Sequence, residues 1–426
     1  MKKKLSDDWS SYYLYYILIL IVCGVFILYS KHDVGNDSSL SDWLINYSGG
    51  FVRRGLVGQI VLEFAYFFSI KLRDAIVIFQ IISFVAYYLL VFFLLRKTIT
   101  NRLLILSVFS PIFILFPIAE IEAFGRKEIF ILLTVILYFF SNIRDIKTQL
   151  IFKFFIFPIS ILIWEPAIIF YPYLLLIDLV VFKIKKLNKS LIWLFLSYLV
   201  VFLVIIFVYL NSISSENFDL MRNTLINDFG EDCYMSCFFV GNQSQNSFME
   251  LANANVAIVK PLHIIRYTLI VLIGFYPLFN LLQISKLNNK ELFFLSNYKN
   301  LLFPFIVVFS PSLFLYVLMY DWGRIVHISY SFMLLSYIFL LKNNLIEIDQ
   351  DKLSQNIFIN LSNKMFFILF IIFCLCWNPK TVMRADIATN SFYKIIYNSS
   401  KKIFGFEGIR FFQDSPIIKF HKKYIE

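Results

Sequence analysis

The chain contains few charged residues for its length. Asp, Glu, Lys and Arg make up 16% of its 426 residues, whereas 59% are apolar. A soluble domain is about one quarter charged, and a chain this apolar cannot cover its folded surface with polar groups in water. The composition therefore excludes a soluble enzyme, a disordered chain and a disulfide-rich secreted scaffold.

Cysteines and known catalytic motifs are also scarce. The five cysteines form no CxxC pair and no zinc-binding spacing. Cys233 and Cys237 lie in a polar loop, where they can form a disulfide if that loop faces an oxidising compartment. The chain also lacks a Walker loop, GxSxG, HExxH and a GxGxxG between strand and helix, so nothing in it supports ATP-driven transport.

Long apolar runs dominate the sequence. They are continuous, unlike the alternating strands of an outer-membrane barrel, and the mean hydropathy is +0.74. A membrane span needs about 20 apolar residues. We therefore predict an all-α, polytopic integral membrane protein with about eleven transmembrane helices. The expected spans are 12–30, 75–95, 103–119, 127–140, 152–164, 167–182, 191–210, 263–282, 301–319, 326–341 and 365–377.

The first apolar run sets the predicted orientation. A basic start precedes residues 12–30 and no small-residue cleavage site follows, so we expect an uncleaved span with its N-terminus in the cytoplasm. The short segment 56–70 contains Glu63, and we expect an interfacial helix on the outer side. The loops RKTITNR, SNIRDIKTQ, KIKKLNK and SKLNNKE then face the cytoplasm, as the positive-inside rule prefers.

This path defines the predicted domains. Residues 1–377 form the transmembrane domain, with outer loops at 31–73 and 211–262, and residues 378–426 form a tail that we place in the periplasm. Asp178 lies near the inner end of its span and is expected to reach the cytoplasmic surface. The net charge of +11 is interpreted as topological, and without a basic stripe on a soluble face no nucleic-acid partner is expected.

Ionisable residues gather at the predicted outer ends of the spans. Such residues are costly at membrane depth and are usually functional. Arg presents a planar fork that binds phosphate oxygens, and a carboxylate can act as a general base or hold a divalent metal, whose requirement stays open. The candidate site residues are Asp42, Arg53, Arg54, Glu120, Glu122, Arg126, Lys127, Glu165, Asp321 and Arg324.

Three short motifs carry a resemblance to a known family. They are DWLINYSGGFVRRGL at 42–56, EAFGRKE at 122–128 and YDWGR at 320–324. With the predicted spans and the interfacial helix, they make the chain resemble the GT-C membrane glycosyltransferases, and more narrowly the O-antigen or capsule repeat-unit polymerases. Arg222 and Arg266 do not reproduce the paired Arg-rich loops of many such polymerases. The acids of the first loop are dispersed, whereas GT-C enzymes often have two adjacent ones.

The resemblance implies a polyprenyl-phosphate- or pyrophosphate-linked sugar donor, used at the periplasmic face of a bacterial inner membrane. Asp42 is then the candidate base, with Glu122 second and Asp321 a further catalytic candidate. Phosphate or substrate binding is expected from Arg53, Arg54, Arg126, Lys127, Glu120, Glu165 and Arg324. Expected partners are the lipid-linked oligosaccharide, the bilayer, and a chain-length regulator or other polysaccharide-assembly proteins.

Two other functions stay open. A non-enzymatic flippase for the same lipid-linked sugars would place its charges along a central passage, often with repeat symmetry. A membrane acyltransferase would need a His on the catalytic face, where only His32 and His327 are available. The position of the charges at span ends, and the absence of a visible repeat, favour the glycosyltransferase.

Overall fold

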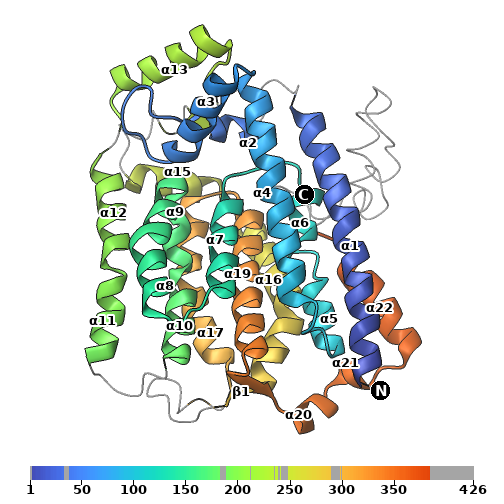
Figure 1. The fold of residues 1–426 in the computed structure, drawn as a ribbon. Coiled ribbons are helices and arrows are strands. Elements are labelled where there is room, and N and C mark those ends of the chain that lie inside the picture. Colours follow the sequence, from blue (N-terminus) through green and yellow to red (C-terminus); the bar gives the residue numbers. More distant parts are fainter. Residues whose placement is uncertain are drawn as a thin grey trace.

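Helices make up nearly all of the regular structure in the computed structural model (Figure 1). The structure describes residues 2–32, 38–182, 189–211, 213–234, 236–237, 240, 248–288, 298 and 300–383. Within these residues one small antiparallel sheet occurs, which pairs β1 (Ser285–Leu287) with β2 (Ile346–Ile348). The prediction of a mainly helical, membrane-embedded chain agrees with this architecture.

In the part of the chain that the structure describes, five helical segments are long and apolar enough to cross a bilayer. They are Trp9–Lys31 within α1 (Lys2–Lys31), α4 (Leu72–Leu95), Ile192–Leu210 across α11 (Lys189–Ser197) and α12 (Leu199–Leu210), α16 (Pro261–Ile284) and α19 (Trp322–Lys342).

The other apolar stretches are short or broken. Proline lies at one of the first two positions of α9, η3, α10 and η4, where the helical hydrogen-bonding pattern changes type. Because a straight span needs about 20 residues, the number of eleven crossings stays a prediction. These elements are α5 (Arg102–Val108), α6 (Leu115–Ala119), α7 (Glu128–Phe140), α8 (Ile146–Ile151), η2 (Phe152–Ile156), α9 (Phe157–Ile163), η3 (Glu165–Phe170), α10 (Tyr171–Val181), α17 (Leu302–Phe309), η4 (Ser310–Phe314), α18 (Leu315–Leu318) and α22 (Asn363–Leu375).

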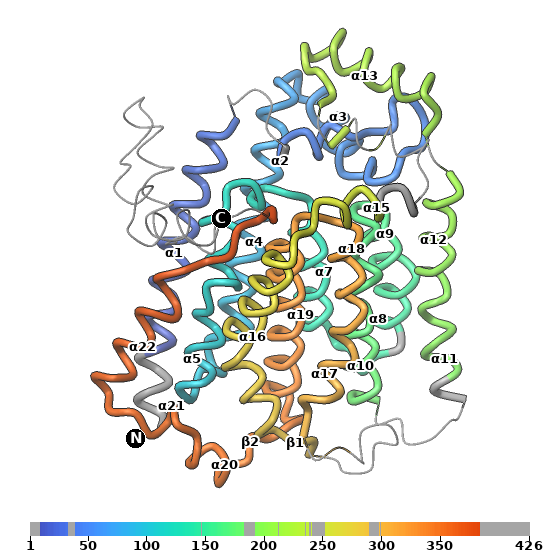
Figure 2. Tube along the Cα trace, turned by 180° about the vertical axis from the view of Figure 1, so that it is seen from behind, coloured from blue at the N-terminus to red at the C-terminus, as the bar shows by residue number. Residues whose placement is uncertain are grey.

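The two ends of the bundle differ in structure (Figures 1 and 2). One end, here called the cap end, carries the short helices that lie over the bundle. These are α2 (Ser38–Ser41), η1 (Asp42–Leu44), α3 (Gly55–Phe68), α13 (Ser215–Phe229) and α15 (Phe248–Ile258). The opposite end, here called the sheet end, holds β1, β2, α20 (Gln350–Ser354) and α21 (Ile357–Asn360).

Helix α19 lies at the centre of the bundle. All its residues from Trp322 to Leu340 are buried, and it packs against α4, α7, α10, α16 and α17. Its first turn, at the cap end, contains Arg324. The most enclosed helix therefore also delivers one of the candidate site residues.

Helix α3 lies at the cap end and does not run through the bundle (Figure 1). α1 finishes and α4 begins at this same end, with α3 between them in the chain. This arrangement agrees with the expectation that segment 56–70 does not cross. α3 packs on α4, α9 and η1, so it also contacts the start of the first outer loop.

Gly58 allows α3 to approach that loop. A Cβ added at Gly58 would lie 1.8 Å from the carbonyl oxygen of Ile45 and 2.7 Å from that of Trp43. We expect Gly58→Ala to lower the thermal stability of the protein, although alanine has the higher helix propensity by about 1 kcal/mol. The clash dominates because a backbone carbonyl cannot rotate away as a side chain can. Melting of the purified protein checks this, with the exposed Ile60→Ala as control; a Gly58→Ala protein as stable as wild type contradicts it.

Asp178 does not reach the cytoplasmic surface as expected. Its side chain has no exposed area, and it pairs with Lys153 at 2.7 Å. It also accepts hydrogen bonds from Tyr138 and, at 2.9 Å, from Tyr198. The prediction was wrong because these partners enclose the carboxylate within the bundle. Tyr138 lies in α7, Lys153 lies in η2, and Tyr198 directly precedes α12.

Candidate functional site

Residues from distant parts of the chain meet at the cap end. The loop predicted to be the first outer one supplies residues 42–54. The loop between α6 and α7, named the second outer loop after its predicted side, supplies residues 120–127, and Glu128 begins α7. Glu165 begins η3, and Asp321 and Arg324 stand at the start of α19. Hydrogen bonds, ion pairs and the field of nearby charges link these segments.

Asp42 begins η1 and is 5% exposed. Within the described residues, no hydrogen bond or ion pair to its carboxylate is formed. Its charge nevertheless acts on Arg54, Lys127 and Arg324. A nearly buried carboxylate that lies among cations without a direct partner is available to accept a proton from a bound molecule.

Arg54 and Glu165 form a two-point ion pair across the site. Nε and one terminal nitrogen of Arg54 lie 2.7 and 2.8 Å from the two Glu165 oxygens, and Arg53 approaches the same carboxylate to 3.8 Å. Burial raises the pKa of Glu165, but the charge and hydrogen bonds of Arg54 outweigh burial, so the pKa falls to about 2. Arg54 spends two of its five N–H donors on this pair.

Lys127 connects the second outer loop to the first. Its ammonium is fully buried and donates to the carbonyl oxygen of Arg54 at 2.7 Å. The negative charge of Asp42 acts on this ammonium, so the buried cation lies in the field of the candidate base.

Arg324 pairs with two carboxylates, those of Asp321 and Glu128. All three side chains are largely buried. Asp321 also feels the charges of Arg126 and Glu122 from the second loop. The ion pair between Asp321 and Arg324 therefore belongs to a larger group of charges that includes α7 and the second outer loop.

A small pocket opens beside this group. Arg126, Glu128 and Arg324 provide its charged part, and α4, α6, α7 and α19 provide an apolar part with His327. The remaining lining residues are Phe84, Tyr87, Tyr88, Pro117, Ala123, Phe124, Gly125, Ile129, Leu132 and Ile328. A cavity that joins a charged end to apolar walls suits an amphipathic molecule with an anionic head.

Gly125 holds the second outer loop in place. Its φ of +76° favours glycine, and its carbonyl oxygen accepts hydrogen bonds from Trp43 and Gln80, each at 2.7 Å. Lys31 donates to the carbonyl oxygen of Ile121 in the same loop at 2.7 Å. These contacts join α1, α4 and the first outer loop to the segment that carries Arg126 and Lys127.

Two predicted site residues of the second loop have different surroundings. Glu120 is 4% exposed and accepts hydrogen bonds from Asn378 Nδ2 and from the backbone N–H and hydroxyl of Thr381. Glu120 therefore ties the chain after α22 to this end. Glu122 accepts a hydrogen bond through its backbone oxygen from Arg126, and its charge acts on Asp321.

The start of the predicted tail packs onto the bundle. Gly323 donates to the carbonyl oxygen of Thr381 at 3.0 Å, and Met383 donates to that of Tyr320 at 3.0 Å. A Cβ on Gly323 would lie 1.9 Å from the carbonyl oxygen of Lys380. Residues 378–383 thus lie against the site, and the rest of the expected tail, 384–426, lies outside the described residues.

Sequence reasoning missed Glu128, Gln80 and residues 378–383. Glu128 stood within the EAFGRKE motif, so the motif contained the signal. Gln80 lies inside an apolar span and was visible as a polar residue at membrane depth. Residues 378–383 offered no signal, because their contacts are largely made by the backbone.

Among the described residues, no three His, Cys, Asp or Glu side chains gather to hold a metal ion. The acids of the site are instead paired with Arg or placed near cations.

Comparisons with models of known protein families, with curated proteins and with solved structures gave no match. Function is therefore inferred from the residues of this chain.

Proposed function

We propose that this chain is a membrane glycosyltransferase that uses polyprenyl-phosphate- or pyrophosphate-linked sugars. The observation that carries the proposal is the placement of Asp42 among Arg54, Lys127 and Arg324, at one end of an apolar helical bundle. The adjoining pocket combines charged and apolar walls. Glycosyl transfer from a lipid phosphate needs three parts: a general base, cations that bind the anion, and a cavity that accepts the lipid.

Each part has a role in the proposed reaction. Asp42 takes the proton from the acceptor hydroxyl, whose oxygen then bonds to the anomeric carbon of the donor sugar. The bond from that carbon to the phosphate oxygen breaks, and the polyprenyl pyrophosphate leaves with its negative charge. Arg126 and Arg324, at the charged part of the pocket, stabilise that charge.

The remaining donors of the site support the same role. Arg54 retains N–H groups beyond those that bind Glu165, and Arg53 is 28% exposed. The apolar lining from α4 and α19 suits the first isoprenoid units of the carrier. The acceptor sugar would enter from the solvent side of the cap end.

We further propose that the cap end faces the periplasm of a bacterial inner membrane, with the N-terminus in the cytoplasm and about eleven crossings. Two observations support this orientation. Basic residues follow spans at the sheet end, such as Lys286 and Lys342. The Cys233–Cys237 disulfide lies beside Ser41 at the cap end, and disulfides persist in oxidising compartments. A polymerase of O-antigen or another surface polysaccharide fits this placement, with a chain-length regulator as its partner.

The test uses the purified protein in lipid nanodiscs. The substrate is the pool of lipid-linked oligosaccharide extracted from source cells that lack this gene, labelled in the sugar. We expect labelled products of two or more repeat units, together with released polyprenyl pyrophosphate in equal amount to the bonds formed. Unchanged donor in the presence of active-site-intact protein contradicts the proposal.

A flippase is separated from an enzyme by a parallel measurement. In proteoliposomes a flippase moves the labelled donor to the other leaflet without forming a glycosidic bond. If the labelled donor is translocated and no elongated product forms, the proposed glycosyltransferase function is wrong and the flippase function takes its place. The Asp232→Asn protein is the matched control in both formats, because Asp232 is an exposed acid of the cap end.

A further inference from the structure

The chain after α13 forms a small cross-linked segment at the cap end. It comprises the described residues 231–234, 236 and 237, and the Cys233–Cys237 disulfide joins two of them, both with fully buried side chains. Cys23, Cys374 and Cys376 are free. The cross-link therefore joins the only two cysteines that belong to the cap among the described residues.

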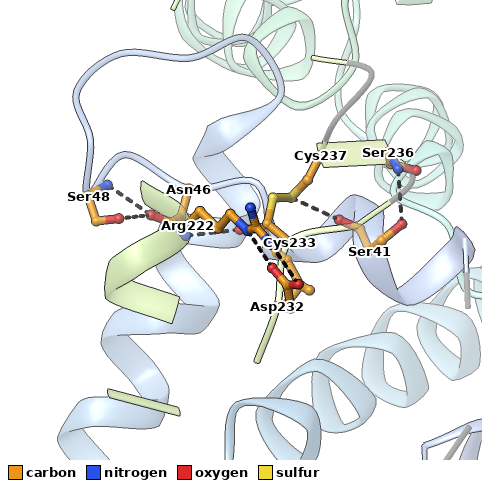
Figure 3. Close-up of a disulfide and its surroundings, with 9 residues drawn as sticks. Ser41, Asn46, Ser48, Arg222, Asp232, Cys233, Ser236 and Cys237 are labelled. Carbon is orange, nitrogen blue, oxygen red and sulfur yellow. Dashed lines mark hydrogen bonds and ion pairs between the residues drawn. A yellow bond between two sulfur atoms is a disulfide. The ribbon is translucent and has the colours of Figure 1, made fainter. Parts of the chain in front are cut away.

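This segment lies directly against Ser41, the residue before Asp42 (Figure 3). The backbone N–H of Ser236 donates to the Ser41 hydroxyl at 3.2 Å. The sulfur of Cys237 lies 3.7 Å from the Ser41 carbonyl oxygen. Because a disulfide sulfur carries no proton, that second contact is one of packing. Ser41 itself has no exposed area.

The far side of the segment is anchored to the bundle. Arg73, in the first turn of α4, binds both oxygens of Glu231 at 2.6 and 2.9 Å and donates to the carbonyl oxygen of His32 at 3.2 Å. A continuous set of contacts thus runs from α4 through Glu231 and the disulfide to Ser41. Helix α13 adds a second support, because its Asn217 backbone touches the turn at Gly49.

The Asp42 carboxylate needs such support from its backbone. Within the described residues no donor binds it directly, so side-chain contacts do not set its direction. The backbone of η1 must do so, and Ser41 is the N-cap residue of η1, directly before Asp42. A general base functions only when it lies within hydrogen-bond reach of the proton that it removes.

We propose that the disulfide-closed segment 231–237 positions Asp42 by holding Ser41. The role of Asp42 as a general base rests on the proposed function, but the statement that this segment fixes the position of Asp42 does not. The cysteines and Ser41 are positioning residues, since none of them lies among the charged groups of the site. Loss of the cross-link should leave the bundle folded and should free the start of η1.

The direct test measures how readily the Asp42 carboxylate is modified by a carbodiimide and an amine, read by mass spectrometry. Glu347, 54% exposed in β2 at the sheet end, serves as the reference carboxylate in the same protein. In Cys233→Ser/Cys237→Ser we expect labelling of Asp42 relative to Glu347 to rise about tenfold, from the loss of a short cross-linked loop. Ser41→Ala, which removes the hydroxyl that accepts from the Ser236 N–H, should give a rise of severalfold and covers the case in which the double variant fails to fold. Cys376→Ser, a free and exposed cysteine, should change nothing.

Activity then separates this inference from the proposed function. With an active wild type, the double variant and Ser41→Ala should lose kcat while KM stays near the wild-type value, because the base acts in the chemical step. Asp42 labelling that is unchanged in both variants overturns the positional claim whatever the activity. A rise in labelling with a wild-type protein that forms no glycosidic bond supports the positional claim and overturns the proposed function.

Discussion

Asp42→Asn should reduce glycosyl transfer by about 10²- to 10⁴-fold, the usual contribution of a general base. Asparagine keeps the shape of aspartate but cannot accept the proton of the acceptor hydroxyl. The measurement is the rate of formation of labelled oligomers by the nanodisc protein at saturating donor. In cells, the same variant at normal protein level should produce surface polysaccharide of single repeat units.

The control for Asp42→Asn is the melting temperature of the same preparation. Asp42 has no direct partner among the described residues, so its amide variant should melt close to wild type. Asp232→Asn should keep both its activity and its melting temperature, because an exposed ion pair such as Arg222–Asp232 contributes little. Full activity in a folded Asp42→Asn protein would show that Asp42 is not the general base. Glu122 and Asp321 would then be the next candidates.

Glu165→Gln should destabilise the folded protein by about 2–3 kcal/mol, below the 3–5 kcal/mol typical of a fully buried pair, since Glu165 retains 16% exposure. The variant leaves the Arg54 guanidinium without its two-point partner and also removes the attraction to Arg53. The apparent melting temperature reports the loss. Glu63→Gln is the matched control, because Glu63 lies on α3 and accepts only an exposed hydrogen bond from Gln59.

The pH dependence identifies Glu165 as the cause. Its pKa falls from 4.5 in the unfolded chain to about 2 in the fold, so the folded state favours the ionised form. The resulting stability is fully present above about pH 4.5 and is lost as pH falls toward 2. The difference in melting temperature between wild type and Glu165→Gln should therefore shrink as pH is lowered below 4.5. A difference that stays constant across that range would assign the loss to packing.

The helical, membrane-embedded architecture follows from local patterns in the chain. Continuous apolar runs predict spans whatever their neighbours are, because lipid requires every backbone group to bond within its own helix. The position of α3 at one end of the bundle was also predictable, since Glu63 and the short length of the segment disfavour a crossing. The breaks in α8–α10 and α17–α18 were less visible, because they depend on how neighbouring helices pack around each proline.

The candidate site divides in the same way. Its residue types were visible at the ends of the apolar runs, because a charge that lies inside such a run stands out by its solvation cost. The pairing of these residues was not visible. The ion pairs of Arg54 with Glu165 and of Arg324 with Glu128 each join residues more than 100 positions apart in the chain. Asp178 shows the same effect in reverse, since a position near a span end predicted exposure and partners from three elements enclosed it.

The sequence by itself determined that this protein is helical, belongs in a membrane and carries its acids and guanidinium groups at the ends of its apolar runs. Hydropathy and charge are properties of single residues and short windows, so they can be read without the fold. Only the tertiary structure decided that Glu165 neutralises Arg54, that Asp42 stays without a direct partner among the described residues, and that a disulfide supports the residue before it. Those outcomes depend on distances between segments far apart in the chain, which are set by how the helices pack together.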